Sequence, residues 1–335
     1  MFYEFGFASD SEFGVGATAF DVTNEMIWTA HADGRLCSFS IQPLNEQQQP
    51  PDDDPEALPQ RILERYSAVR AHFSDEQHSA ILQLLPDGYG VTSLSSSLLR
   101  HHSHGGLQRL SVSFDQWGND MLCMTTQRSH AKRSRVVVAG SSNIVDIDIT
   151  SGGWAQRSVP VPGGEPVVSI KSRPDRSLMY AATAVGNVYT LDAMTLQSPN
   201  GGNVSRFDAH PGGSVTSMDV QGDFLVTCGM VNKRGALVTD SYLKIYDLRM
   251  NRLLAPILIM AGATAPGMGS AGPALVHFHP SLSSTLIVVA EDSRWTTFSI
   301  DSVISSASRG SSSIIPPVLE WQHPMCPAVI SCMDV

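Results

Sequence analysis

Apolar residues along this chain come in short runs separated by Gly, Pro, Asn, Asp and Ser, and helical periodicity is almost absent. The runs are rich in Val, Ile, Leu and Thr, which suit pleated strands, and turn-forming residues lie between them. This pattern predicts many short strands and therefore an all-β fold. The clearest runs are Arg135–Gly140, Asn143–Ile149, Leu225–Gly229, Tyr242–Leu248, Leu286–Ala290 and Arg294–Ile300.

The strands recur in a set order, and the strand that opens each group can be followed along the chain. These first strands are expected to start near residues 17, 80, 121, 167, 215, 274 and 328, roughly 41 to 63 residues apart. Without the visible insertions the spacing is about 44 residues, and a period of about 40–45 residues with four strands each is typical of WD-repeat propellers. We predict a degenerate WD-repeat β-propeller over 1–335, with six blades and the start of a seventh.

Insertions interrupt these repeats. The segment Gln42–Gln60 holds five acidic residues, five prolines and no basic residue. A segment of this composition has too little apolar surface to fold, so we expect a disordered loop. The shorter insertions are a basic loop over Gln127–Ser134, a lengthened turn over Val231–Thr239 and a Gly-, Ala-, Pro- and Met-rich stretch over Gly262–Gly272.

The composition narrows the class of protein. Of the 335 residues, 42% are hydrophobic and 16% charged, and the formal net charge is -10. This hydrophobic content excludes a fully disordered chain, and the acidic balance disfavours a protein whose main task is to grip nucleic acid. Five widely spaced cysteines without a CxxC motif favour a reduced compartment. Because the N-terminus has no signal-peptide pattern and no apolar stretch is long enough to span a membrane, we expect a soluble intracellular protein without membrane contact.

One polar set has the spacing of the hydrogen-bonded chain that holds many WD repeats together. In that chain a His before the first strand meets an Asp before the third, and a Ser or Thr on the second strand and an aromatic residue on the third complete it. The fifth repeat offers His210, Thr227, Asp240 and Tyr246 in this order, and the other repeats lack the set. Because buried turn groups need hydrogen-bond partners, we predict a structural tetrad here.

Metal-binding and catalytic constellations are weak. The D-x-E pairs Asp10/Glu12 and Asp54/Glu56 do not lie on strand patterns, so we interpret both as solvated acids. The histidines of the HHSH cluster face opposite sides if they lie on a strand, so a polar loop at a strand end is preferred to a shared metal ion. We interpret Cys326 and Cys332 as small buried hydrophobes. The clustered histidines are His101, His102 and His104.

A basic group marks the candidate for weak RNA contact. It consists of Arg128, Lys132, Arg133 and Arg135. Cations of this kind can pair with phosphates, but no aromatic residue is interleaved to stack on bases, so a solvated connection between strands is preferred. No phosphate-binding glycine loop and no GxSxG nucleophile elbow occur. We therefore predict no catalytic residue, no metal site and no cofactor.

Several segments, taken in order, resemble a known family. They are Tyr66–His72, Val215–Gly229, Tyr242–Ile257 and Val276–Ala290, and the run RVVVAGSSNIVDIDI fits the third blade of that family. Together they resemble the N-terminal WD-repeat domain of the catalytic subunit of the poly(A)-nuclease deadenylation complex, the PAB-dependent poly(A)-specific ribonuclease. The resemblance covers most of the chain from about Ala17 onward. Because that family is seven-bladed, the resemblance implies that the seventh blade is incomplete within 1–335.

The resemblance also implies a role. In that family the propeller precedes an inactive ubiquitin-hydrolase-like domain and an exonuclease domain, and no nuclease domain is expected in this chain. It therefore implies a non-catalytic scaffold propeller of an mRNA deadenylation complex, in the cytoplasm and its P-bodies. The implied partners are the pseudokinase regulatory subunit and, indirectly or weakly, poly(A)-binding protein on poly(A) RNA. A generic WD-repeat adaptor in another assembly, and direct RNA binding by the basic group, stay open as alternatives.

Overall fold

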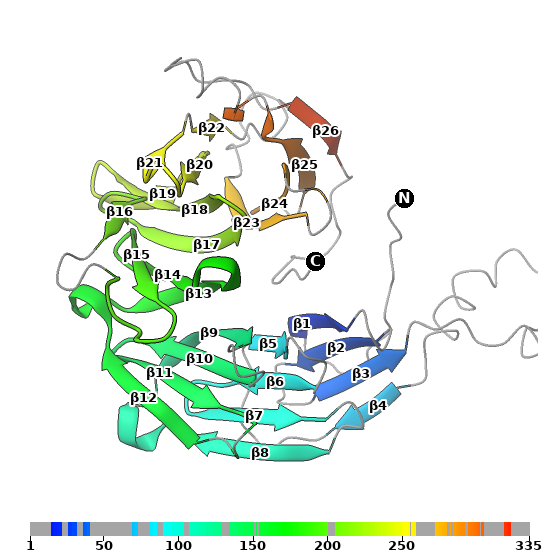
Figure 1. The fold of residues 1–335 in the computed structure, drawn as a ribbon. Helices are drawn as coiled ribbons and strands as arrows, with labels where there is room; N and C mark the ends of the chain where they lie inside the picture. Colours follow the sequence, from blue (N-terminus) through cyan, green and yellow to red (C-terminus); the bar gives the residue numbers. More distant parts are fainter. Residues whose placement is uncertain are drawn as a thin grey trace, which may run out of the picture. The chain divides into compact units, whose positions relative to one another are not determined.

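The fold is seen in a computed structural model of the 335-residue chain. It describes residues 15–21, 26–31, 36–40, 69–72, 81–85, 90–103, 107–118, 120–128, 134–150, 152, 154–199, 205–254, 256–258, 272–279, 282, 284–291, 294–301, 303–304 and 318–322. The chain divides into two compact units between Phe114 and Asp115. Each unit is built from antiparallel sheets (Figure 1); all but the fifth have four strands that follow one another in chain order, and the fifth has six strands.

The first unit contains two such sheets. The first sheet has the order β1 (Val15–Asp21), β2 (Met26–His31), β3 (Leu36–Ser40), β4 (Val69–His72), and the second has the order β5 (Ile81–Leu84), β6 (Val91–Leu94), β7 (Leu98–His102), β8 (Gln108–Ser113). Trp28 and Leu36 of the first sheet and Val91 of the second share one apolar cluster and are 0% exposed. Burial of these side chains between the two sheets removes a large apolar area from water.

In the described part of the second unit, the strands form four sheets and three short 3-10 helices are complete. Its third and fourth sheets have the orders β9 (Met121–Arg128), β10 (Ser134–Gly140), β11 (Asn143–Asp148), β12 (Trp154–Pro160) and β13 (Val167–Arg173), β14 (Leu178–Thr183), β15 (Asn187–Asp192), β16 (Arg206–Asp208). The fifth follows β17 (Ser214–Gln221), β18 (Phe224–Lys233), β20 (Tyr242–Asp247), β21 (Arg252–Leu253), with β19 (Ala236–Thr239) on β18 and β22 (Ile257–Leu258) on β20. The sixth is β23 (Pro273–Phe278), β24 (Thr285–Ala290), β25 (Trp295–Ser299), β26 (Val318–Gln322). The 3-10 helices span Asp115–Trp117, Pro162–Gly164 and Pro174–Arg176.

The middle strands explain why the sequence shows continuous apolar runs and little alternation. Every residue of β10 and of β24 is buried. A strand with apolar neighbours on both faces of its sheet carries mostly apolar side chains, and its buried polar residues stand at the strand's start, as Ser134 and Arg135 do in β10 and Thr285 does in β24. One cluster joins the fifth and sixth sheets through Val226, Ile245 and Val288, and another joins the fourth and fifth sheets through Tyr180, Met218 and Tyr246.

The first strands of the sheets lie where the sequence places six of the seven predicted starts. The strands β1, β5, β9, β13, β17 and β23 contain or adjoin residues 17, 80, 121, 167, 215 and 274. The predicted strand near 328 and the insertion Gln42–Gln60 lie outside the described residues.

A β-bulge recurs near the start of the first strand and aligns the repeats. One residue is left out of the pairing after Val15, Met121, Val167, Val215 and Pro273. A bulge of this kind bends its strand and is a defined structural feature, so its recurrence in five sheets marks equivalent positions. The fourth residue after each of the last three of these positions is Lys171, Asp219 and His277.

Candidate functional site

The predicted tetrad centres on a buried histidine between two strands of the fifth sheet. His210 lies in the turn before β17, Thr227 on β18 and Asp240 immediately before β20. The His210 Nδ1 atom lies 3.2 Å from Asp240 Oδ2, and its Nε2 atom lies 3.2 Å from Thr227 Oγ1. His210 and Thr227 are 0% exposed. The structure thus brings three of the four predicted residues into one hydrogen-bonded chain.

The chemistry of the partners fixes the protonation of His210. A carboxylate only accepts hydrogen bonds, so Nδ1 donates to Asp240, and Nε2 of the neutral ring accepts from the Thr227 hydroxyl. Burial lowers the pKa of His210, partly opposed by the hydrogen bond to Asp240. Burial alone raises the pKa of Asp240, but the hydrogen bond from His210 and the charge of Lys244 outweigh it and lower that pKa overall. The neutral imidazole and the ionised carboxylate therefore stabilise each other.

Lys244 completes this network, and sequence reasoning missed it. Lys244 stands directly opposite Thr227 in the β18–β20 register, two residues before the predicted aromatic member, Tyr246. Its Nζ atom donates to the Ala209 carbonyl and lies 3.4 Å from Asp240 Oδ2. In the sequence alone, a lysine on a strand is expected to point into solvent. Only the strand register shows that Lys244 pairs with Asp240. We call His210, Thr227, Asp240 and Lys244 the His210 network.

Tyr246 has a different role from the predicted one. It stands opposite Leu225, and its ring lies 4.7 Å from the ring of Phe207 at a tilt of 48°. Such tilted aromatic pairs pack favourably. Burial raises the pKa of the Tyr246 hydroxyl. Tyr246 therefore belongs to the apolar cluster between the fourth and fifth sheets, and among the described residues no hydrogen bond links it to Thr227.

The ordering of carboxylate, imidazole and hydroxyl in the His210 network is the one that nucleophilic hydrolases use. A nucleophile must reach its substrate, however, and Thr227 and His210 are both 0% exposed. Gly229 closes the site further, because a Cβ atom there would lie 2.9 Å from the His210 ring and would clash with the Ser214 carbonyl oxygen. The network therefore holds a turn against its sheet and performs no chemistry.

The fourth sheet has a second network built from other residue types. Glu165, just before β13, accepts a hydrogen bond of 2.8 Å from Thr183 Oγ1 and bonds of 2.9 and 3.0 Å from Asn187 Nδ2. Burial and the hydrogen bond with Glu165 raise the pKa of Tyr189 on β15. Four polar residues thus meet here as in a tetrad: Glu165, Thr183, Asn187 and Tyr189. Because neither a His nor an Asp is among them, the spacing of His and Asp in the sequence does not reveal this network.

Salt bridges join the first strands of neighbouring sheets. Asp219 on β17 lies 3.4 Å from Lys171 Nζ on β13 and 3.3 Å from His277 Nδ1 on β23, and it accepts the Phe278 N–H at 2.9 Å. Although burial acts to raise it, the pKa of Asp219 falls to about 2 because of the hydrogen bond with His277 and the charge of Lys171. We call Lys171, Asp219 and His277 the first-strand row, since they occupy the three equivalent positions defined by the bulge.

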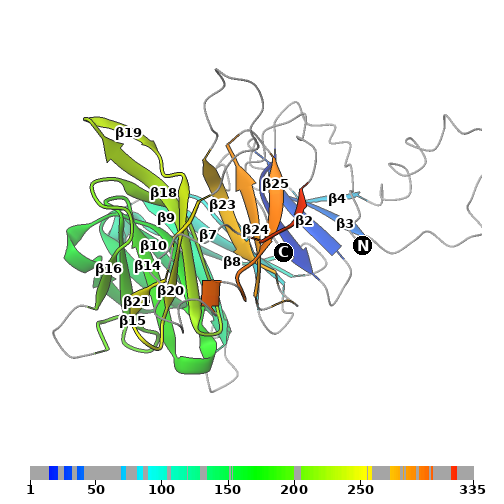
Figure 2. The same cartoon turned by 90° about the horizontal axis from the view of Figure 1, so that it is seen from above.

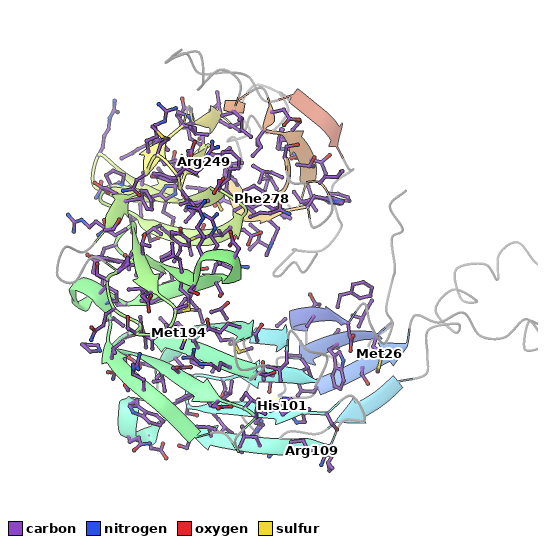
Figure 3. All side chains as sticks on the ribbon, viewed as in Figure 1. Met26, His101, Arg109, Met194, Arg249 and Phe278 are labelled. Carbon is purple, nitrogen blue, oxygen red and sulfur yellow. The ribbon has the colours of Figure 1, made fainter. Side chains whose placement is uncertain are left out.

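A second ionic cluster involves the sequence Asp247-Leu248-Arg249, called here the DLR segment, which begins at the last residue of β20 in the fifth sheet. Arg249, which Figure 3 labels, approaches two carboxylates. Its Nη2 atom lies 2.9 Å from Asp247 Oδ2, and its Nε atom lies 3.6 Å from Asp223 Oδ2. Asp223 in turn lies 2.8 Å from Arg173 Nη2 and 3.3 Å from Arg176 Nη2 of the fourth sheet. This cluster ties the end of β13 to the turn between β17 and β18, so the DLR segment has a structural role.

Two sequence interpretations are wrong. Arg135, one of the predicted RNA contacts, is buried at 7% exposure, and its guanidinium pairs with Asp146, with a hydrogen bond of 2.9 Å from Nε to Oδ1. A buried, paired cation cannot reach a phosphate. The histidine cluster does not form a polar loop, because His101 and His102 lie within β7 and are buried.

Other predicted positions are only partly visible. Arg128 ends β9, while Lys132, Arg133, His104, Asp10, Glu12, Asp54, Glu56, Cys326 and Cys332 lie outside the described residues. Within the described ranges, no group of three or more His, Cys, Asp or Glu side chains could hold a metal ion. The helices among those residues are too short to cross a membrane.

Comparisons with known proteins give one consistent family. The family model described as PAN2 N-terminal matches residues 56–305. The PAN2-PAN3 deadenylation complex catalytic subunit of Aspergillus terreus is 31% identical over 275 residues, covering 82% of this chain and 20% of that protein. The same subunit of Gallus gallus is 29% identical over 285 residues, covering 84% and 20%. The chain spans about a fifth of the length of the curated relatives it matches.

Solved structures agree on the fold. The Neurospora crassa Pan2 WD40 domain superposes with a TM-score of 0.66 at 18% identity, over 96% of this chain and 83% of that one. The RRP9 WD40 repeats superpose with a TM-score of 0.68 at 10% identity, over 97% and 84%. These likenesses confirm the predicted WD-repeat propeller class. Because the family model matches residues 56–305, which are most of this chain, the chain belongs to the PAN2 N-terminal family.

Proposed function

We propose that this chain is the non-catalytic scaffold propeller of an mRNA poly(A)-tail-shortening complex. The single observation that supports it most is the family match over residues 56–305. The relatives that match over the same region carry names of deadenylation-complex catalytic subunits. The chain corresponds to about a fifth of the length of those proteins. The role proposed for it is docking within the complex.

The internal hydrogen bonds and ion pairs of the sheets support a docking role. In the His210 network, in the first-strand row and around Glu165, which accepts from Thr183 and Asn187, the polar side chains of each group bind one another. Satisfied internal networks give sheets a fixed arrangement, and a rigid scaffold with variable loops is what binding surfaces are commonly built on. Blade edges and loops would then carry the contacts.

The proposed partners are the pseudokinase regulatory subunit and, more weakly, poly(A)-binding protein on poly(A) RNA, in the cytoplasm and its P-bodies. Direct RNA binding by the basic group loses support, because Arg135 is committed to Asp146. Docking on protein surfaces also suits a chain with a net charge of -10, whose field repels phosphates.

Binding of the purified chain to the regulatory subunit tests the proposal. Isothermal titration should give a saturable 1:1 or 1:2 complex with this chain, or with a version extended by the linker that follows it in the family, and none with an unrelated WD-repeat propeller. The isolated chain should leave poly(A) intact in the presence of Mg²⁺. Absence of binding by both versions would overturn the docking role, and poly(A) degradation by the isolated chain would overturn the non-catalytic assignment.

A further inference from the structure

The insertion in the fifth repeat forms a hairpin that leaves its sheet. β18 is ten residues long, and it pairs with β17 only as far as Met230, while Val231, Asn232 and Lys233 continue and pair with β19. In Figure 2 this hairpin extends beyond the other strands of its unit. Residues 232–237 are all exposed. The predicted lengthened turn is therefore a two-stranded projection.

The tip of the hairpin has a defined shape. Lys233 pairs with Ala236 across a two-residue turn in which Arg234 and Gly235 have φ angles of 56° and 86°. Two consecutive positive φ angles are characteristic of the type I′ turn, whose twist matches that of a hairpin. The Asn232 side chain accepts the Gly235 N–H at 2.9 Å. These contacts present the tip in one conformation.

The base of the hairpin is anchored as well. Thr239 Oγ1 donates to Glu291 Oε1 of the sixth sheet, and the Gly272 N–H donates to Glu291 Oε2 at 3.3 Å. Gly213 passes so close to the Met230 carbonyl oxygen that a Cβ atom there would clash. Close backbone approach of this kind leaves little room for the hairpin to pivot. The projection is thus held at both ends.

The exposed surface combines apolar and basic side chains. Leu237 is 57% exposed, and it lies opposite Asn232 on one face of the hairpin. Val231 and Val238 pair on the other face, and both are half-buried. Lys233 and Arg234 at the tip form no ion pair with any carboxylate in the described part of the chain. The segment Val231–Thr239 holds no acidic residue, although the whole chain has a net charge of -10.

Leu237 is exposed on one face of the hairpin and Val231 and Val238 are half-buried on the other, and a partner that covers them would remove this apolar surface from water. Two unpaired cations beside these side chains are complementary to carboxylates. RNA fits less well, because the hairpin offers no aromatic ring on which a base could stack. The required occupant is a polypeptide segment that carries an apolar anchor flanked by acidic residues.

We propose that the hairpin Met230–Thr239 is a docking element for an acidic, apolar-anchored segment of the regulatory subunit. This inference rests on the proposed function, and it specifies which surface the partner uses. The partner segment reaches around the tip: Leu237 supplies the apolar contact on one face, while Lys233 on the other face and Arg234 in the turn pair with the partner's carboxylates. The charge pairs chiefly raise the association rate, and the apolar anchor slows dissociation.

Single substitutions with matched controls test the inference. Leu237→Ser is compared with Leu107→Ser, because Leu107 is 59% exposed on a connection of the first unit. Lys233→Glu is compared with Arg109→Glu, an exposed cation on β8 (Figure 3). Binding of the purified chain to the regulatory subunit is measured by surface plasmon resonance at low and high salt. Oligo(A) binding is measured in parallel, and melting temperatures verify that each variant is folded.

We expect Leu237→Ser and Lys233→Glu each to weaken binding about tenfold or more, as interface anchors do, while both controls bind like the wild type. The Lys233→Glu loss should shrink as salt rises. Wild-type affinity in both hairpin variants would overturn the inference and leave the proposed function standing. A wild-type chain that does not bind the subunit would overturn both. Loss of oligo(A) binding with unchanged subunit binding would overturn the inference in favour of an RNA contact.

Discussion

At Thr227 a single substitution can remove a hydrogen bond of the His210 network without changing the shape of the side chain. Thr227→Val keeps the volume and the branched outline of the side chain, but it removes the hydroxyl that donates to His210 Nε2 across 3.2 Å. Both groups are 0% exposed, so water cannot replace the lost donor. The buried Nε2 atom then loses its partner, which costs about 1–3 kcal/mol of unfolding free energy.

Part of this cost is offset, because the new methyl group is buried and contributes about 0.8 kcal/mol. We therefore expect a net destabilisation of about 0.2–2.2 kcal/mol. For a domain of this size, 1 kcal/mol corresponds to roughly 2–4 °C, so the melting temperature should fall by up to about 9 °C. Differential scanning calorimetry at neutral pH measures this directly.

Thr297→Val is the matched control. Thr297 lies on β25 of the sixth sheet at 3% exposure, and its hydroxyl forms no hydrogen bond with another described residue. The same chemical change should leave the melting temperature there unchanged or slightly higher. If Thr227→Val lowers the melting temperature no more than Thr297→Val does, the His210–Thr227 hydrogen bond contributes nothing to stability and the account of the network is refuted.

Three further predictions follow from buried groups. Acidification should destabilise the chain below about pH 6.5, because burial lowers the pKa of His210 and the unfolded state binds the proton first. Melting temperatures measured from about pH 7.5 to 5 should fall with falling pH, and His210→Gln should make this fall smaller. An equally steep fall in the variant would contradict this. Gly229→Ala should cost about 3 kcal/mol or more, since its Cβ atom meets the His210 ring and the Ser214 carbonyl, whereas Gly222→Ala, with open space around it, should cost about 1 kcal/mol; chemical denaturation compares the two. Arg135→Met should cost about 3–5 kcal/mol by leaving Asp146 buried and unpaired, and Arg135→Met with Asp146→Leu should recover much of the loss; a double variant as unstable as the single one would refute the pairing.

The strands were the most predictable part of the molecule, because a strand buried on both faces leaves a continuous apolar run in the sequence. β10 is such a strand, and its run of apolar residues can be recognised from the sequence alone. The placement of His210, Thr227 and Asp240 was also predictable, since the spacing of turn and strand residues fixes which of them meet.

The roles of charged residues were not predictable, because they depend on register and burial. Arg135 looked like part of an exposed basic loop, and only the pairing of β10 with β11 brings it beside Asp146. Glu165 replaces the expected histidine with an acceptor, so its partners become donors and the motif changes completely. The Arg-Gly turn of the β18–β19 hairpin lacks the Asn-Gly sequence that usually announces such a turn.

The first-strand row has a consequence for how the family's sequences can change. Asp219 serves two neighbours at once, whereas Lys171 and His277 each serve one. A substitution at Asp219 therefore leaves Lys171 on β13 without its carboxylate and, in the same step, removes the partner of His277 on β23. A substitution at Lys171 or at His277 leaves the other contact of Asp219 intact. We expect substitutions at Lys171 and His277 to come before substitutions at Asp219. Relatives that lack the central carboxylate should therefore already lack the residue that corresponds to Lys171 or to His277.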